Sequence, residues 1–334
     1  MKIRLVRAYA TVVLAAGLLC SCASPAAETA ADTELVELAP LTAPAGVELG
    51  AIPDAFVPLS ASPFVSLVSA PAASGTKVKK NGSATIDYSN SQDGYIMACW
   101  TEGGTPKIKV QVKGPSGTAY NYNLRTDGQY ETFPLSDGNG SYTLGVYKNV
   151  SGTQYSTVIT ETVGVQLTDE FGPFLRPNQY VNFTSSSAAV SKAAQLCGGI
   201  TDNLEKVAKV YNFVITNTSY DRAKASSVQS GYLPNVDETL STGKGICFDY
   251  AALMCAMLRS QNVPVKLVVG YTGEAYHAWI NVYSEADGWI EGKIFFNGRE
   301  WKLMDPTFAS SGNNSDSIRE YIGNGANYSA KYQY

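Results

Sequence analysis

The sequence predicts an α+β domain preceded by a small all-β sandwich. Short alternating runs broken by turn residues fill residues 77–167, and such runs are typical of half-buried strands. Beyond residue 168, a stretch that would form a helix apolar on every face precedes three strand-like runs. This order favours helices packed on an antiparallel sheet. At 334 residues the chain is long enough for two domains.

The first 22 residues have the layout of an export signal. The chain starts with a basic group formed by Lys2, Arg4 and Arg7. Residues 8–19 are then uncharged and mostly apolar, a stretch too short to span a bilayer as a helix. The signal ends in Leu19-Cys20-Ser21-Cys22-Ala23, which resembles a bacterial lipobox. We expect a diacylglyceryl anchor on Cys22 that holds the exported chain at the outer face of a bacterial envelope membrane; an ordinary cleaved signal is the alternative.

Residues 23–76 predict a tether between this anchor and the folded domains. The stretch contains no Lys or Arg and is rich in Ala, Pro, Ser and Thr. A segment of this composition buries too little apolar surface to form a core of its own. We therefore expect the first domain to begin at about Lys77.

Residues 77–167 predict the β-sandwich. The run 107–113 alternates apolar and polar residues, as a strand with one buried face should. Gly-Pro-Ser-Gly and Asp-Gly-Asn-Gly supply turns between such runs. The region resembles immunoglobulin and fibronectin modules. Tyr120, Tyr122 and Tyr130 could form a ligand platform, but aromatic residues that alternate along strands are more often core or cross-strand pairs.

Residues 168–334 mix helix and strand signals. Asp202 followed by Glu205 predicts the start of a helix that ends by Asn217. Residues 246–259 have almost no polar face and predict a buried central helix. Strand-like runs follow at 263–271, 275–283 and 300–305, with a hairpin signal, Asn-Gly, at 297–298.

A cysteine and the chain's one histidine suggest thiol chemistry in this second domain. Cys247 would lie in the first turn of the buried helix, where free N–H groups and the helix dipole stabilise a thiolate and an oxyanion. His277 is the only imidazole that could act as its base. Asp305 ends the last strand-like run, and it could orient the imidazole if that strand lies beside the strand of His277. Trp279 shares a strand face with His277 and could shield it from water.

Three motifs occur in order: Gly-Lys-Gly-Ile-Cys-Phe-Asp-Tyr-Ala from 243, His-Ala-Trp-Ile from 277, and Trp-Lys-Leu-Met-Asp-Pro-Thr from 301. Together they resemble the transglutaminase-like superfamily. The resemblance covers about residues 203–308 and implies a papain-like core, with a buried cysteine helix packed on an antiparallel sheet, in the domain of residues 168–334. It implies a Cys247, His277 and Asp305 triad, supported by Gly245 and Trp279. One departure is the long stretch 285–299, which suggests an inserted hairpin.

The resemblance implies thiol attack on an amide or peptide carbonyl through an acyl-enzyme. Hydrolysis, amine transfer and deamidation all remain open, because water and amines compete for the same intermediate. The expected partners are a peptide or protein substrate, with cell-wall peptide as one candidate, and the membrane through the lipid anchor. The alternative function is a non-catalytic lipoprotein that uses the same fold for recognition.

Composition argues against other classes of partner and cofactor. The net charge is −4 and only 16% of residues are charged, so nothing favours nucleic acid. The chain has no CxxC pair and no second histidine for a zinc site. It also has no acidic cluster typical of a calcium site. We expect no metal and no cofactor, and we expect Cys99 and Cys255 to be inert core residues.

Overall fold

The computed structural model describes residues 70–285, 288–290, 294–296, 300–302 and 327–334. The predicted signal, Cys22 and the predicted tether up to residue 69 lie outside this range. Within these stretches, no helix is both long enough and apolar enough to cross a membrane.

The N-terminal region is built from two four-stranded antiparallel sheets. One has the strand order β1-β2-β3-β6 and the other β5-β4-β7-β8. The strands are β1 (Val78–Lys80), β2 (Ala84–Asp87), β3 (Tyr95–Trp100), β4 (Ile108–Lys113), β5 (Ala119–Leu124), β6 (Glu131–Pro134), β7 (Gly140–Ser151) and β8 (Gln154–Val165). A short 3-10 helix, η1 (Ser91–Asp93), leads into β3.

A shared apolar core holds the two sheets together. Ile86 and Trp100 from the first sheet and Val110 and Leu144 from the second are almost completely buried in one cluster. Strand β4 alternates buried and partly exposed residues, as its alternating sequence predicts. The two sheets therefore pack on each other through a common apolar core, which is what a sandwich requires.

Two of the three tyrosines considered as a ligand platform are buried. Tyr120 and Tyr122 are 7% and 1% exposed, and their rings lie 5.6 Å and 5.8 Å from the ring of Tyr334. Tyr130 is 37% exposed. The interpretation of Tyr120 and Tyr122 as packing residues is therefore confirmed.

The second region mixes helices with short strands. Its helices are η2 (Gly172–Phe174), α1 (Ala188–Cys197), α2 (Asn203–Asn217), α3 (Arg222–Ser227), α4 (Val236–Thr242) and α5 (Cys247–Arg259). Its strands are β9 (Ser219–Tyr220), β10 (Lys244–Gly245), β11 (Val265–Thr272), β12 (Ala275–Ser284), β13 (Gly288–Ile290), β14 (Ile294–Phe296), β15 (Glu300–Lys302) and β16 (Tyr328–Gln333).

Helix α2 begins and ends where its sequence predicts. The Asp202 side chain accepts a hydrogen bond from the Glu205 N–H at 2.7 Å, which satisfies one of the free donors of the first turn. Val207, Val210 and Val214 recur at helical spacing and are fully buried. The helix ends at Asn217.

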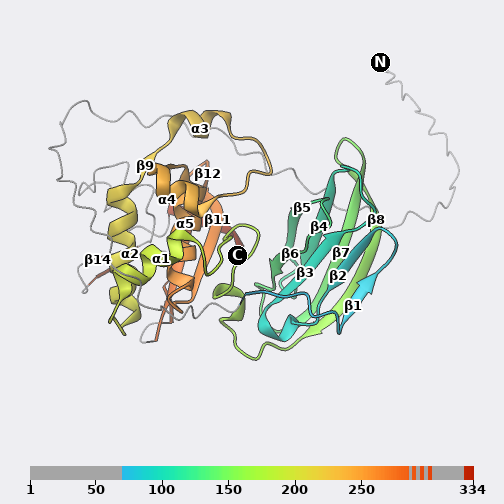
Figure 1. The fold of residues 1–334 in the computed structure, drawn as a ribbon, viewed down its shortest axis with the longest axis horizontal. Coiled ribbons are helices and arrows are strands. Elements are labelled where there is room, and N and C mark those ends of the chain that lie inside the picture. The colour runs from blue at the N-terminus through green and yellow to red at the C-terminus, as the bar shows by residue number, and fades with distance from the viewer. Residues whose placement is uncertain (1–69, 286–287, 291–293, 297–299, 303–326) are drawn as a thin grey trace, which may run out of the picture. The chain divides into compact units, whose positions relative to one another are not determined.

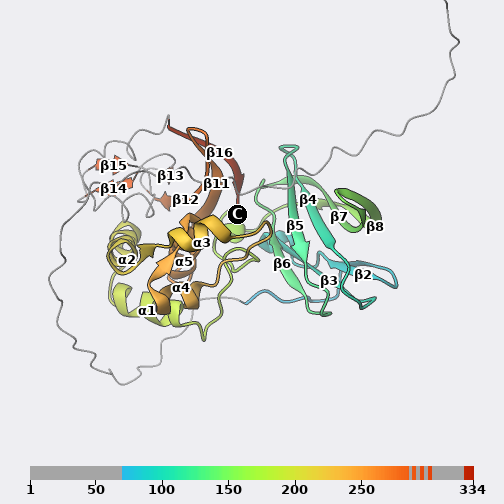
Figure 2. The same ribbon diagram turned by 90° about the horizontal axis from the view of Figure 1, so that it is seen from above.

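Helix α5 is the centre of the second region. Twelve of its thirteen residues are buried. It packs on β11 and β12, while α1, α2 and α4 contact its other sides. Figure 1 and Figure 2 show α1, α4 and α5 gathered beside the strands β11 and β12. A helix enclosed on all sides needs apolar residues all round, which explains the composition of this segment.

The sheet that receives α5 has the strand order β13-β12-β11-β16, and all its pairs are antiparallel. The fold class predicted from the sequence is confirmed: a β-rich N-terminal region is followed by a mixed region with helices and antiparallel sheets. Strand β16 was not predicted; it joins β11 from the far end of the chain. Strand β15 pairs with β14, so the described neighbours of β12 are β11 and β13.

Candidate functional site

Cys247 is the first residue of α5, as predicted, and it is 8% exposed. The preceding Ile246 is extended, with φ −95° and ψ 175°, so the chain turns into the helix at the cysteine. A first-turn N–H has no partner within its helix. The Cys247 N–H is therefore a donor that the helix does not use.

Gly245 allows the close approach that this turn needs. A Cβ atom at residue 245 would lie 2.7 Å from the Cβ of Asp249, nearer than two such atoms can come. Gly243 ends α4 with φ +60°, a left-handed conformation that glycine adopts at low cost. The two glycines of the Gly-Lys-Gly motif thus have separate steric roles: one ends α4 and the other admits the start of α5.

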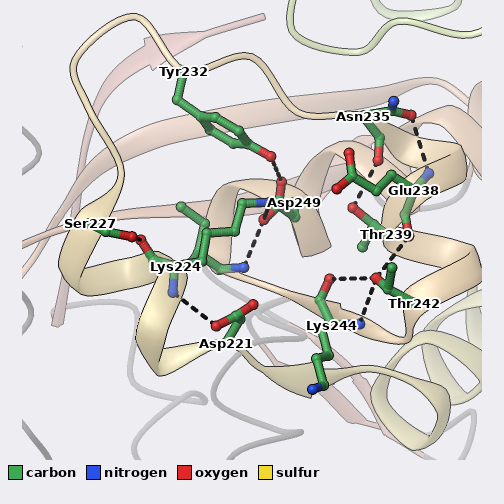
Figure 3. A network of polar contacts seen from close by, with 11 residues as sticks. Asp221, Lys224, Ser227, Tyr232, Asn235, Glu238, Thr239, Thr242, Lys244 and Asp249 are labelled. Carbon is green, nitrogen blue, oxygen red and sulfur yellow. Dashed lines mark hydrogen bonds and ion pairs between the residues drawn. The ribbon is translucent and has the colours of Figure 1, made fainter.

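Asp249 lies two residues after Cys247 and is fully buried. Its carboxylate accepts hydrogen bonds from the Tyr232 hydroxyl at 2.5 Å and the Ile246 N–H at 2.8 Å. Lys224 Nζ lies 2.8 Å from the same carboxylate (Figure 3). Burial and Asp249 together raise the pKa of the Tyr232 hydroxyl well above its usual value. The carboxylate therefore joins α3 and the 228–235 loop to the first turn of α5.

Asp249 was not among the residues predicted to support the site. One signal could have identified it: an acid at the third helical position is the usual partner of the N-terminal backbone N–H. What the sequence does not indicate is that Lys224 and Tyr232 meet at this carboxylate, because both lie more than fifteen residues away along the chain.

His277 lies in β12 and is 2% exposed. Its ring lies 6.4 Å from the ring of Trp279, at an interplanar angle of 23°. Tyr328 of β16 lies 6.5 Å from the imidazole and 5.2 Å from the indole. Trp279 thus shares the strand face of His277, as strand alternation predicts, and Tyr328 lies near both rings.

Gly270 lies opposite His277 in the β11–β12 ladder. A Cβ atom at residue 270 would collide with the Ser329 carbonyl of β16 and would lie 2.9 Å from the Trp279 ring. A residue without a side chain is therefore required beside His277 for β16 and Trp279 to pack there.

The structure relates the cysteine and histidine elements through helix–sheet packing. Helix α5, which starts at Cys247, packs on β12, which carries His277. Burial raises the pKa of Tyr276, next to His277, well above its usual value, and the charges of neighbouring tyrosines and of Cys247 raise it further. Cys247 therefore lies within electrostatic reach of this part of β12.

Two of the predicted site residues lie outside the described residues: Asp305 and Cys22. Strand β15, which precedes Asp305, is described only as far as Lys302. The orienting role of Asp305 and the lipid anchor on Cys22 therefore stay predictions.

In the part of the chain that the structure describes, no group of three or more His, Cys, Asp or Glu side chains could hold a metal ion. A cavity of about 350 Å³ lies elsewhere, lined by Arg125, Glu131, Asn178, Gln179, Leu233, Pro234 and their neighbours. Because neither Cys247 nor His277 lines it, this cavity is not the site of the predicted thiol chemistry.

Comparison with known families decides the class of the second region. Residues 190–292 match the family model described as the transglutaminase-like superfamily. This part of the chain is a transglutaminase-like domain. The match spans α1 to β13, so it includes Cys247 and His277 but stops before Asp305. The resemblance predicted from the three motifs is confirmed at the level of the family.

Solved structures that resemble the chain include two bacterial proteins and one fish protein. A "putative cysteine protease" from Cytophaga hutchinsonii is 16% identical, with a TM-score of 0.36 over 78% of this chain and 74% of the other. A "putative protease" from Parabacteroides distasonis is 12% identical, with a TM-score of 0.27 over 60% and 61%. Red sea bream transglutaminase is 11% identical, with a TM-score of 0.29 over 64% and 47%. No curated protein matches the chain.

Proposed function

We propose that the transglutaminase-like domain is a thiol enzyme that attacks an amide or peptide carbonyl. Cys247 is the nucleophile, His277 is its base, and Asp305 orients the imidazole. The observation that carries the proposal is the position of Cys247 at the first residue of a buried helix packed on the strand of His277, the chain's one histidine. A helix start supplies free N–H groups, and a buried helix holds the sulfur rigidly.

The reaction follows from these roles. His277 takes the thiol proton, sulfur bonds to the carbonyl carbon, and the carbonyl electrons move to oxygen. When this oxyanion collapses, the carbon–nitrogen bond breaks and the amine leaves with the proton held by His277. Water or a primary amine then attacks the thioester, gives a proton to His277 and releases the thiolate. Hydrolysis, deamidation and amine transfer differ only in substrate and acceptor.

The proposed setting is the outer face of a bacterial envelope membrane, with Cys22 lipidated and residues 23–76 as a tether. The support is the basic start, the apolar stretch and the lipobox-like sequence around Cys22. Peptides or proteins outside the cell are then the accessible substrates. Mass spectrometry of the N-terminal peptide from expressing bacterial cells tests this setting: a diacylglyceryl group on Cys22 is the expected result, and an unmodified cysteine contradicts it.

The enzyme is tested by mixing the full-length protein with glutamine-containing peptides, with and without a primary amine, and measuring product masses. Addition of the amine identifies a transferase, shorter peptides identify a protease, and the small mass gain of amide hydrolysis identifies a deamidase. Cys247→Ala should abolish every product. Cys255→Ala is the matched control, because Cys255 lies in the same helix, is fully buried, and should leave the products unchanged.

Unchanged peptides in every condition would contradict the proposal. That result would favour the recognition lipoprotein, whose binding of the same peptides can be measured directly by calorimetry.

A further inference from the structure

Two tyrosines lie between α2 and the cysteine helix, Tyr220 in β9 and Tyr232 in the 228–235 loop, and each is a candidate to present a hydroxyl to the reacting carbonyl. Hydrogen bonding distinguishes the two hydroxyls. The Tyr232 hydroxyl donates to the Asp249 carboxylate at 2.5 Å, so its one proton is already in use. The Tyr220 hydroxyl oxygen is buried, and it has no hydrogen-bond partner among the residues that the structure describes.

Tyr220 is held in register with the approach to Cys247. Strand β9 pairs in parallel with β10, and Tyr220 lies opposite Gly245, two residues before the cysteine. The flanking backbone bonds run from Ser219 N–H to the Gly243 carbonyl at 2.8 Å and from Asp221 N–H to the Gly245 carbonyl at 2.9 Å. The backbone of Tyr220 is thus fixed to the same Gly-Lys-Gly segment that positions Cys247.

Helix α5 holds this strand from a second side. Tyr250, three residues after Cys247, donates its hydroxyl to the Thr218 carbonyl at 2.8 Å. Asp221 accepts from the Lys224 N–H at 2.9 Å at the start of α3, and Lys224 in turn binds Asp249 in α5. Contacts on both sides of Tyr220 therefore tie β9 to the first turn of the cysteine helix.

The Tyr220 hydroxyl lies within electrostatic reach of the sulfur and stays protonated there. Burial raises the pKa of Tyr220 well above its usual value, and the charge of a Cys247 thiolate raises it further. A phenol in this state donates a hydrogen bond and does not ionise. A buried hydroxyl without a partner costs free energy, so its retention beside a nucleophile is best explained by a partner that is present only during the reaction.

We propose that the Tyr220 hydroxyl and the Cys247 backbone N–H are the two donors that bind the oxyanion formed when the Cys247 thiolate attacks the substrate carbonyl. The inference rests on the proposed thiol function. When the carbon–sulfur bond forms, the carbonyl electrons move to oxygen, and Tyr220 donates a hydrogen bond to this oxygen without transferring its proton. Collapse of the intermediate restores the carbonyl and expels the amine, and the phenol is unchanged. Donors aimed at a developing oxyanion stabilise the transition state more than the substrate.

The test compares two reactions of Cys247 in the full-length protein and its Tyr220→Phe variant. One reaction is acylation by an activated p-nitrophenyl ester of a glutamine-containing peptide, followed by p-nitrophenolate release; it passes through an oxyanion. The other is alkylation by iodoacetamide at a saturated carbon, which does not. We expect Tyr220→Phe to lower kcat for acylation by roughly 10²- to 10³-fold with little change in KM. Alkylation should stay within about twofold of wild type, because the thiolate is untouched.

Tyr276→Phe is the control, because the charge of Cys247 also acts on Tyr276. It should keep wild-type acylation. Equal acylation by wild type and Tyr220→Phe would overturn the oxyanion role while leaving the enzyme proposal standing. Equal losses of acylation and alkylation would also overturn it, since they would show an effect on the thiol itself. A wild-type protein that alkylates but is never acylated would overturn the thiol-enzyme proposal and this inference with it.

Discussion

Tyr232 and Asp249 share a partly buried hydrogen bond of 2.5 Å at the start of the cysteine helix. The bond joins a loop residue to a carboxylate that is fully buried two residues beyond Cys247. Lys224 balances the charge of this carboxylate from α3. The start of α5 is therefore held by a charged network as well as by apolar packing.

The first prediction concerns Lys224. Replacing it by Met leaves the Asp249 carboxylate buried without its cation, and breaking a buried ion pair in this way is strongly destabilising. We expect a loss of about 3 kcal/mol in the free energy of unfolding, the low end for such a change, because 26% of the Lys224 side chain is exposed. Urea denaturation followed by circular dichroism measures it.

Lys79→Met is the matched control for this substitution. Lys79 lies 3.1 Å from Glu161 in an ion pair whose side chains are 48% and 27% exposed. Exposed pairs contribute at most about 1 kcal/mol. Equal losses in the free energy of unfolding for the two variants would show that the Asp249 network stabilises the fold no more than an exposed ion pair does.

The second prediction concerns Gly270, beside His277. Gly270→Ala places a methyl group against the Ser329 carbonyl and the Trp279 ring. We expect a loss of about 1–3 kcal/mol, the usual cost of overpacking, together with weaker protection of the β16 amides. Denaturation and hydrogen exchange measure the two effects. Gly164→Ala in β8 is the control, because a Cβ atom there meets nothing within 4 Å; a similar loss at Gly164 would contradict the steric explanation.

The third prediction concerns pH. Burial raises the pKa of Tyr122 well above its usual value of 10.0, while the unfolded chain ionises at that value. Above about pH 10, Tyr122 is ionised in the unfolded chain but still protonated in the folded protein. The unfolded state then binds fewer protons, so the free energy of unfolding falls as the pH rises. Tyr122→Phe removes this group, and its hydroxyl has no hydrogen-bond partner in the described part of the chain.

We therefore expect the unfolding free energy of Tyr122→Phe to equal or exceed that of wild type at pH 7, and to fall less steeply between pH 9 and 11. Urea titrations across this range measure both quantities. Tyr271→Phe is the control, because Tyr271 is 39% exposed. A steeper fall in Tyr122→Phe than in wild type would contradict the prediction.

The fourth prediction concerns the four cysteines of the described domains, all of which are free thiols. Iodoacetamide should label Cys247 fastest. Burial raises the pKa of the Cys255 thiol to about 12, so little reactive thiolate forms there. Cys99 and Cys197 are 2% and 3% exposed, against 8% for Cys247. Peptide mapping against time gives the four rates.

His277→Ala should slow the labelling of Cys247 alone, because the proposed base of that thiol is lost. Slow and equal labelling of all four cysteines would count against the thiol-enzyme proposal. A uniform increase would indicate that the substitution has loosened the fold, and a loss of the circular dichroism signal would accompany it.

Local patterns predicted those elements whose shape depends on neighbours in the chain. Helix α2 follows from Asp202 and from the helical spacing of Val207 and Val214. Helix α5 follows from a run with no polar face. Strand β16 could not be predicted in the same way, because it is a strand only through pairing with β11, about sixty residues earlier. Helices α1, α3 and α4 are short, and their signals were missed.

The sequence by itself determined the class of the second domain and its candidate chemistry: Cys247 at a helix start, one histidine in a strand, and three motifs in the order of the transglutaminase-like superfamily. These features depend only on residue type and spacing, which do not require knowledge of tertiary contacts. Only the tertiary structure decided which of the two candidate tyrosine hydroxyls already has a hydrogen-bond partner. The sequence does not distinguish Tyr220 from Tyr232. Strand pairing places Tyr220 opposite Gly245 with a hydroxyl that has no hydrogen-bond partner among the described residues, while the buried Asp249 carboxylate accepts a hydrogen bond from Tyr232. Hydrogen-bond satisfaction depends on contacts between distant segments, so it exists only once the chain has folded.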